Sequence, residues 1–272
     1  MEHYFWLIPL GFIMGTYGTL IGAGGGFLVV PLLLVLYQAE DPEIITSISL
    51  AVIAFNALSG SVAYARMGRI NYKAGILFSI AAIPGAVLGA LSTALLSRLA
   101  FDTMFGLLLI ISSAYLLIHP IGVRNTSRKK TLPPYPHNPL TSDHSRAIHR
   151  DKFTVGMVLS FFVGYLSSML GIGGGIIHVP VLVRLLDFPV HCATATSHFI
   201  LAVMALSGTI VHVVTGTFYH GLHRTIALSI GVIGGAQAGA ALSEHVSGSW
   251  IIRGLAVALG VVGLRLLFIA LL

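Results

Sequence analysis

Long apolar runs dominate this chain and restrict what it can fold into. Runs near residues 5–37, 45–65, 74–96, 101–119, 154–186, 193–215, 225–243 and 250–272 are each long enough to reach across a bilayer, which takes about 20 helical residues. Of the 272 residues, 56% are apolar and 9% charged, whereas about 25% are charged in soluble domains. The sequence therefore predicts an all-α integral membrane protein with about eight membrane-embedded helical segments.

Basic and acidic residues occupy different loops between these runs. Most of the basic charge lies in the stretch 124–152 and in the loop 66–73, whereas the loop between the first two runs carries only Glu40, Asp41 and Glu43. Cytoplasmic loops are the ones enriched in Lys and Arg, so the basic loops are expected inside and the acidic loop outside. The net charge of +6 is thus explained without a nucleic-acid partner. The expected surroundings are a lipid bilayer, and the expected location is the bacterial inner membrane, crossed several times.

The chain contains one pattern twice. Residues 15–31, GTYGTLIGAGGGFLVVP, align without a gap with residues 164–180, GYLSSMLGIGGGIIHVP, and after a slip of one residue the match continues through 46–68 and 194–216. We expect a first transmembrane repeat at 1–120, a cytoplasmic linker rich in basic residues and proline at 121–152, and a second transmembrane repeat at 153–272. Many secondary transporters are built from such repeats, with the substrate bound between them.

Each repeat carries four glycines within five residues at membrane depth. Glycine costs about 1 kcal/mol relative to alanine inside a helix, so the first helix of each half should break at residues 22–26 and 171–175. Broken backbone survives in a membrane only where protein buries it or where it lines a polar cavity. The following helices, expected to begin at Phe27 and Ile176, would direct free amides and partial positive charge into the break. Such helix N-termini bind anions.

Two prolines and a set of polar side chains accompany the breaks. Pro31 and Pro180 lie a few residues into the following helices, where a missing amide or a kink can be absorbed. Hydroxyl and amide side chains near the next helix could donate hydrogen bonds to an oxyanion, although hydroxyls in helices also bond back to their own carbonyls. The predicted substrate-binding residues are Gly22, Gly24, Gly25, Gly26, Phe27, Gly171, Gly173, Gly174, Gly175, Ile176, Thr46, Ser49, Asn56, Thr194, Thr196, Ser197 and His198.

Glycines outside the breaks have a simpler expected role. Small residues let membrane helices approach closely. We therefore expect helix packing at Gly60, Gly85, Gly89, Gly208, Gly235 and Gly239.

Three histidines lie within the apolar runs of the second half. His178, His198 and His212 are the intramembrane side chains that titrate near neutral pH, which makes them the candidates for proton coupling. The alternative for each is a hydrogen-bonded packing residue. Their spacing lacks the close pairs typical of zinc ligands, so neither a metal nor a cofactor is predicted. The chain also lacks a Gly-x-Ser-x-Gly elbow and a His-Glu-x-x-His pair, and we do not expect an enzyme.

Both glycine motifs, GAGGGFLVVP at 22–31 and GIGGGIIHVP at 171–180, are followed by a helix containing Thr and Ser and by a later Ser-Gly. In this combination the sequence resembles the TauE/SafE family. The resemblance covers nearly the whole chain except the linker. It implies a secondary transporter, and specifically an exporter, of small sulfur-containing anions such as sulfite or organosulfonates. The long linker and the second-half histidines depart from the family pattern. One alternative is a passive anion channel. Another is a carrier of a different small anion, or of a metal that the second-half histidines bind. A homo-oligomer is compatible with each of these functions.

The first run leaves two topologies open. Its 33 residues, 5–37, would form a helix of about 50 Å, whereas the hydrocarbon layer is about 30 Å thick. If the break only kinks a crossing helix, each half crosses four times and the repeats are parallel. If the break makes a re-entrant hairpin, each half crosses three times and the repeats are inverted.

Overall fold

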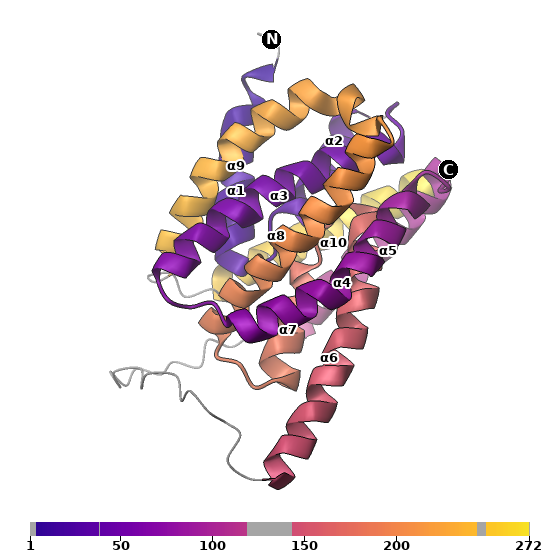
Figure 1. Cartoon of the computed structure of the whole chain (residues 1–272). Coiled ribbons are helices and arrows are strands. Elements are labelled where there is room, and N and C mark those ends of the chain that lie inside the picture. The colour runs from indigo at the N-terminus through magenta and orange to yellow at the C-terminus, as the bar shows by residue number, and fades with distance from the viewer. Residues whose placement is uncertain (1–3, 38, 119–142, 244–248, 272) are drawn as a thin grey trace.

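The computed structural model describes residues 4–37, 39–118, 143–243 and 249–271, and every regular element in these ranges is helical (Figure 1). This confirms the predicted all-α class. The elements are α1 (Leu7–Ile21), α2 (Gly26–Leu36), α3 (Pro42–Arg66), α4 (Tyr72–Thr93), α5 (Arg98–Ile118), α6 (Asp143–Leu170), α7 (Gly175–Leu185), α8 (Val190–Val214), η2 (Thr217–Gly221), α9 (Leu222–Leu242) and α10 (Ser249–Leu271).

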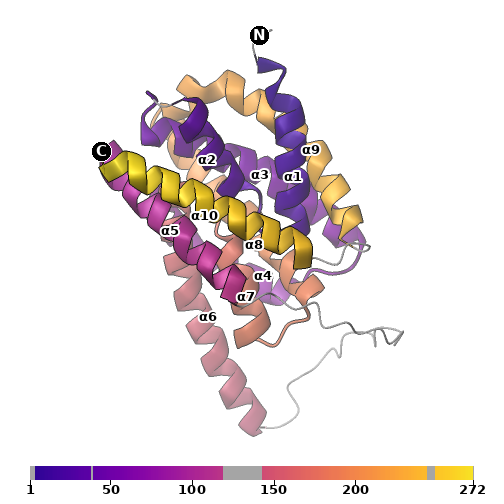
Figure 2. The same ribbon diagram turned by 180° about the vertical axis from the view of Figure 1, so that it is seen from behind.

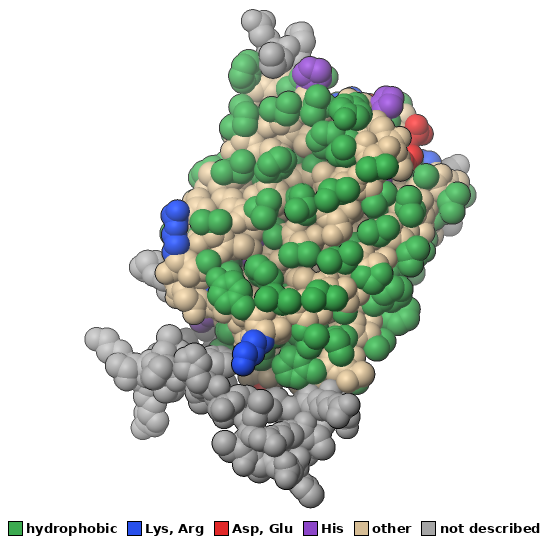
Figure 3. Space-filling model, viewed as in Figure 1, with side chains coloured by type: hydrophobic (Ala, Val, Ile, Leu, Met, Phe, Trp, Pro, Cys, Tyr) green, Lys and Arg blue, Asp and Glu red, His purple; other side chains and the backbone are tan. Residues whose placement is uncertain are grey.

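Within the described ranges, five segments are long and apolar enough to cross a membrane: α3, α4, residues 153–170 of α6, α8, and η2 with α9. Shorter apolar helices include α1, α2 and α7. Large apolar side chains such as Ile80, Ile210 and Ile230 are more than half exposed. Figure 3 shows apolar side chains over the visible face, with Lys, Arg, Asp and Glu toward its edges. A surface of this kind is suited to lipid, and the chain is a multi-pass membrane protein.

Glycines bring the outer helices together. Gly85 and Gly89 of α4 lie against the carbonyls of Phe161 and Tyr165 in α6. In the same way Gly235 and Gly239 of α9 lie against the carbonyls of Phe12 and Thr16 in α1. An added side chain at any of these four positions would meet backbone, so the packing role predicted for these glycines is confirmed. In both pairs the contacts advance in the same direction along the two helices, which are therefore parallel.

The central pair, α3 and α8, runs antiparallel. A Cβ placed on Gly60 would lie 2.6 Å from the His198 ring, and one placed on Gly208 would lie 2.9 Å from the Leu50 side chain. Residue numbers thus rise along one helix as they fall along the other. On the far side of the molecule, α5 and α10 lie side by side (Figure 2). They are also antiparallel, because Gly106 faces Gly263 and Ser113 donates to the carbonyl of Ala256 at 2.6 Å.

The helix pair α1–α2 returns to the end at which it began. Tyr4, before α1, stacks on His223 with ring centroids 6.4 Å apart. Arg224, the next residue of α9, lies 4.0 Å from the centre of the Tyr37 ring, just after α2, and donates to Glu40 at 2.6 Å. The start of α1 and the end of α2 therefore meet at the start of α9. The geometry is that of a hairpin, and a kinked crossing helix would not produce it.

The pair α6–α7 has the same form at the other end of α3 and α8. Phe153 and Met157, at the start of the apolar part of α6, pack in one cluster with Leu186 and Phe188, which follow α7. Ala74 at the start of α4 belongs to the same cluster. The two hairpins therefore enter the helical bundle from opposite ends.

The predicted linker and the structure overlap at one edge. Residues 119–142 lie outside the described ranges, but α6 begins at Asp143, so residues 143–152 are helical where the sequence predicted linker. The last proline of the linker is Pro139, and no glycine or proline follows it before Lys152. An aspartate at the first position also favours a helix N-terminus.

Candidate functional site

The predicted helix breaks occur at both glycine motifs. α1 ends at Ile21 and α2 begins at Gly26; α6 ends at Leu170 and α7 begins at Gly175. The glycines at positions 22, 24, 25, 171, 173 and 174 have φ between 56° and 86°, a region open to glycine and costly for other residues. Both following helices begin one residue earlier than predicted. The last glycine of each motif has no positive φ and joins the helix, while Gly25 and Gly174 precede it as N-caps.

The two breaks pack against each other in the interior. A Cβ on Gly26 would lie 2.6 Å from the carbonyl oxygen of Ile172, and one on Gly175 would lie 2.6 Å from the Cα of Ala23. Phe27 is completely buried beside the first break, whereas Ile176 is only partly buried. Neither motif has room for a side chain at its last glycine, because the other motif occupies that space.

Crossed hydrogen bonds connect each break to the opposite half. Ser49 of α3 donates to the carbonyl of Gly171 at 2.6 Å, and Ser197 of α8 donates to the carbonyl of Gly22 at 3.2 Å. The threonines one turn earlier follow the same rule: Thr46 lies beside Gly171, and Thr194 lies beside Gly22. The structure therefore brings these four predicted residues to the breaks. The serine hydroxyls are engaged with backbone carbonyls here.

The backbone amides at the breaks are only partly free. The amides of Ala23 and Gly24 donate to the carbonyl of Gly18 at 2.9 and 3.0 Å, and that of Ile172 donates to Ser167 at 3.0 Å. In the described residues, the amides of Gly26 and Phe27 make no backbone hydrogen bond. The N-terminus of α2 thus keeps its positive end, which lies against the Ile172 carbonyl.

A buried chain of polar side chains lies next to the first break. Nε2 of His198 lies 3.2 Å from the hydroxyl oxygen of Thr19, which in turn donates to Oδ1 of Asn56 at 3.3 Å. The hydroxyl of Tyr64 donates to the Thr19 carbonyl at 2.8 Å, and its ring meets the His198 ring edge-on at 5.6 Å. The side chains of Thr19, Asn56 and His198 are 0% exposed. Asn56 and His198 are therefore in one enclosed polar group.

Several atoms of this region have no hydrogen-bond partner. They include Nδ1 of His198, Nδ2 of Asn56 and the hydroxyl of Thr46. The Gly22 carbonyl lies near the His198 ring, and Nδ1 of that ring has no hydrogen-bond partner. Unsatisfied buried polar groups are rare in folded proteins and call for an explanation such as a ligand or water.

The remaining predicted residues lie elsewhere. Thr196 accepts a hydrogen bond from the amide of Asn71 at 3.0 Å, in the loop before α4. His178 lies in α7, with Nδ1 3.2 Å from the Gly174 carbonyl and Nε2 3.3 Å from the hydroxyl of Ser160. Pro31 and Pro180 lie inside α2 and α7, as expected. Thr196 thus does not join the polar group beside the first break.

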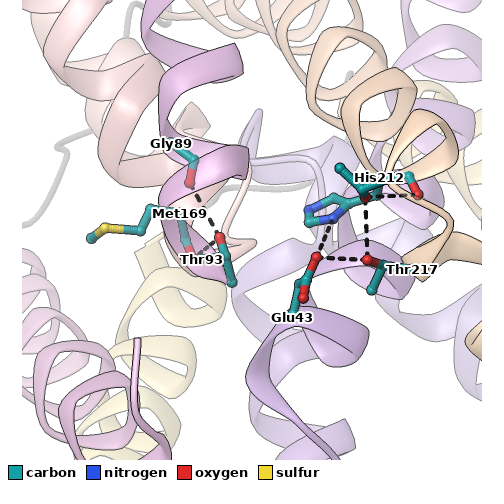
Figure 4. Close-up of polar contacts among 7 residues, drawn as sticks. Glu43, Gly89, Thr93, Met169, His212 and Thr217 are labelled. Atoms are coloured by element: carbon teal, nitrogen blue, oxygen red, sulfur yellow. Dashed lines mark hydrogen bonds and ion pairs between the residues drawn. The ribbon is translucent and has the colours of Figure 1, made fainter. Parts of the chain in front are cut away.

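His212 is near the opposite end of α8 from Thr196. Its ring is 1% exposed, and Nδ1 lies 3.9 Å from a carboxylate oxygen of Glu43, which also accepts from Thr217 at 2.6 Å (Figure 4). The same figure shows Thr93 donating to the carbonyls of Gly89 and Met169, at 3.2 and 3.0 Å, where α4 meets the end of α6. The three histidines therefore occupy three separate surroundings.

Sequence reasoning missed Thr19 and Tyr64. Thr19 has a hydroxyl counterpart, Ser168, at the same position of the second repeat, and this was the available signal. Tyr64 aligns with His212, and nothing in its neighbourhood marked it. Its contact with Thr19 joins α3 to α1 across 45 positions of sequence.

An apolar groove of about 530 Å³ lies between α5, α6 and α7 and is lined by residues such as Leu107, Leu166 and Pro180. It contains almost no polar surface, and nothing in it resembles a seat for an anion. It lies outside the polar group described above.

Two helix breaks that pack against each other, with hydroxyls at both and a buried polar group beside the first, inside a lipid-facing helical bundle, are features of the secondary-transporter class. A profile described as "Sulfite exporter TauE/SafE" matches residues 7–266. The chain belongs to the TauE/SafE family of membrane transporters, and the resemblance in its glycine motifs is confirmed. It is a transporter and not an enzyme.

Relatives with similar sequences extend over nearly the whole chain. The "Probable membrane transporter protein YunE" of Bacillus subtilis is 32% identical over 96% of this chain and 96% of its own length. The "Probable membrane transporter protein MJ0441" of Methanocaldococcus jannaschii is 25% identical over 96% of this chain and 94% of its own. The YdhB protein of Bacillus subtilis, described in the same words, is 24% identical over 96% and 99%. No solved structure matches the chain significantly.

Proposed function

We propose that this chain exports small sulfur-containing anions, such as sulfite or organosulfonates, across the bacterial inner membrane. The observation that carries the proposal is the meeting of the two glycine breaks, held by Ser49 and Ser197 across the halves. The description of the matching family supports sulfite as the first anion to test. The same description supports export as the first direction to test.

In this proposal the chain consists of two inverted repeats, 1–120 and 153–272, joined by the cytoplasmic linker. The aligned helices α3 and α8 run antiparallel, and so do α5 and α10. In the repeat alignment α1 corresponds to α6, and α9 corresponds to α4. The contact of α1 with α9 therefore has its equivalent in the contact of α6 with α4. Three crossings and one re-entrant hairpin per half give the eight membrane segments expected from the sequence.

The substrate would bind at the breaks, contacted by the amides of Gly26 and Phe27, the unpaired hydroxyl of Thr46, and Asn56 with His198. These side chains are 0% exposed, so the described conformation is closed on both sides. Transport then requires one repeat to rock against the other. The serine bonds to Gly171 and Gly22 are the contacts that such a movement would exchange for contacts with an oxyanion.

The two other candidate functions differ in what they require. A passive channel needs a continuous path, whereas the breaks seal the interior by direct backbone contact. A metal carrier needs several ligands together, and no group of three or more His, Cys, Asp or Glu side chains could hold a metal within the described ranges. An anion carrier agrees better with the hydroxyl and amide groups at the breaks.

The test is transport of sulfite and a small sulfonate by the purified chain in proteoliposomes. We expect flux that saturates with substrate concentration and responds to a pH gradient. Gly25→Leu and Gly174→Leu should each abolish transport without preventing insertion, because positive φ values of 78° and 56° exclude a leucine.

Gly234→Leu is the matched control. Gly234 is exposed on α9, its nearest neighbour to an added Cβ is 3.6 Å away, and leucine suits a lipid-facing position. Transport that survives both break substitutions would remove the proposed site. Flux that never saturates would favour a channel.

A further inference from the structure

The three buried histidines differ in what their ring nitrogens meet. Both nitrogens of His178 have partners, the Gly174 carbonyl and Ser160. His212 faces the carboxylate of Glu43. His198 uses only Nε2, and no ion pair of its ring occurs in the described part of the chain. An extra proton on His198 would therefore create a buried positive charge for which the protein supplies no counter-charge.

The hydrogen bonds around His198 indicate which nitrogen already carries a proton. Thr19 has one hydroxyl proton, and it is donated to Oδ1 of Asn56. Nε2 of His198 must then donate to the Thr19 oxygen. At one end of this row of hydrogen-bonded side chains, Nδ1 of His198 keeps a free lone pair. At the other end, Nδ2 of Asn56 keeps free hydrogens. The polar chain thus ends in one unused proton acceptor and one unused donor.

The groups around the His198 ring come from α1, α3 and the first break. α1 contributes Thr19, α3 contributes Gly60 and the ring of Tyr64, and the break contributes the Gly22 carbonyl. Tyr64 is the titratable member of this group, and its hydroxyl is already donated to a backbone carbonyl. No neighbour among these groups brings a negative charge.

The chain itself contains a comparison for this site. In the repeat alignment, Leu50 occupies the position of His198, Met204 that of Asn56 and Gly208 that of Gly60. A Cβ placed on Gly208 would lie 2.9 Å from the Leu50 side chain, just as one placed on Gly60 would lie 2.6 Å from the His198 ring. The fold therefore accommodates an apolar side chain at this position, and packing does not explain why one half carries histidine and asparagine.

We propose that His198 takes up a proton together with the transported anion, so that each anion crosses the membrane with one proton. The proton-binding histidine belongs to the second repeat, and the first repeat has Leu50 at the corresponding position. A buried cation without a partner is strongly unfavourable, and a bound anion next to Nδ1 removes that penalty. Proton and anion therefore bind cooperatively, and the cooperativity is reciprocal. This inference rests on the proposed function and adds the coupling ion and the residue that binds it.

The experiment measures proton uptake on anion binding by the purified full chain in detergent. The probe is methanesulfonate, which has no titratable proton near neutral pH, added in weak buffer with a pH indicator, while binding is measured by calorimetry. We expect the wild-type protein to take up close to one proton per bound anion, and its affinity to rise up to about tenfold for each unit that the pH falls.

Variants distinguish the histidines. His198→Leu copies the residue of the other repeat and should bind the anion at least tenfold more weakly with no proton uptake; His198→Gln is a second variant with the same expectation. His178→Leu and His212→Gln should still take up a proton. Anion binding to the wild type without proton uptake would overturn this inference and leave the proposed function standing. Uptake that persists in both His198 variants would also overturn it, and a wild type that binds neither methanesulfonate nor sulfite would overturn both proposals.

Discussion

Replacing Ser49 with alanine removes one of the two hydrogen bonds that hold a glycine break in place. Ser49 is 0% exposed, and its hydroxyl lies 2.6 Å from the Gly171 carbonyl, which is short for a bond between two oxygens. Side-chain hydrogen bonds in membrane proteins contribute about 0.6 kcal/mol on average and about 1.7 at most, whereas a buried carbonyl left without its partner costs about 1–3 kcal/mol. We expect Ser49→Ala to lower the free energy of unfolding by about 1.5 to 3 kcal/mol, more than tenfold in the equilibrium constant.

Alanine variants of Ser197 and Ser47 are the controls for the stability loss expected of Ser49→Ala. Ser197 donates over 3.2 Å, so Ser197→Ala should cost less than Ser49→Ala. Ser47, on the same helix, is 1% exposed and its hydroxyl has no partner. Ser47→Ala should therefore change stability by less than about 0.5 kcal/mol or raise it.

The assay is equilibrium unfolding in mixed micelles with increasing SDS, followed by circular dichroism. The expected order of loss is Ser49→Ala, then Ser197→Ala, then Ser47→Ala. If the Ser49 and Ser47 variants unfold at the same SDS fraction, the bond from Ser49 to Gly171 does not stabilise the second break.

Two further predictions concern the outer contacts. Gly235→Ala should destabilise the chain by about 1–3 kcal/mol, because the new methyl meets the backbone of α1. Gly234→Ala, one residue away, should be neutral, because the nearest atom to its new methyl is 3.6 Å away. Equal effects of the two substitutions on SDS unfolding would contradict the close packing of α9 on α1. Arg224→Gln removes both the 2.6 Å bond to Glu40 and the contact with the Tyr37 ring, and should increase proteolysis in the 37–41 loop, while Glu40→Gln, which keeps the ring contact, should do so less. Identical cleavage of both variants and the wild type would show that Arg224 does not anchor this end of the hairpin.

Much of the architecture could be predicted because its causes are local. Apolar runs predict membrane helices, and consecutive glycines predict a break wherever they occur in such a run. Both breaks lie where the glycine motifs predicted them, and the packing glycines Gly85 and Gly235 contact backbone as expected. The alignment of the two repeats also identified Ser49 and Ser197 as a pair, although it predicted that they face an anion and they donate to carbonyls here.

The rest depended on contacts between distant residues. The hairpin at α1–α2 follows from contacts of Tyr37 and Glu40 with Arg224, nearly 190 positions away, and no local pattern encodes them. The group around His198 draws on three helices, so the hydrogen bonds that distinguish this histidine from His178 are visible only in the folded chain. The same holds for Thr196, which has the residue type of a ligand but contacts the loop before α4.

The exchange of partners between the halves also affects how the protein is made. α1 packs on α9 and α4 packs on α6, so the glycine faces of α1 and α4 have no partner until the second half leaves the ribosome. During that interval the first break lacks the bond from Ser197 and would be left open in the membrane. If the repeats are inverted as proposed, a single half on its own would need a second copy in the opposite orientation to cover these faces. In the proposed arrangement of inverted repeats, the duplication supplies, within one chain and in a fixed ratio, the oppositely oriented partner that each half needs to complete its fold.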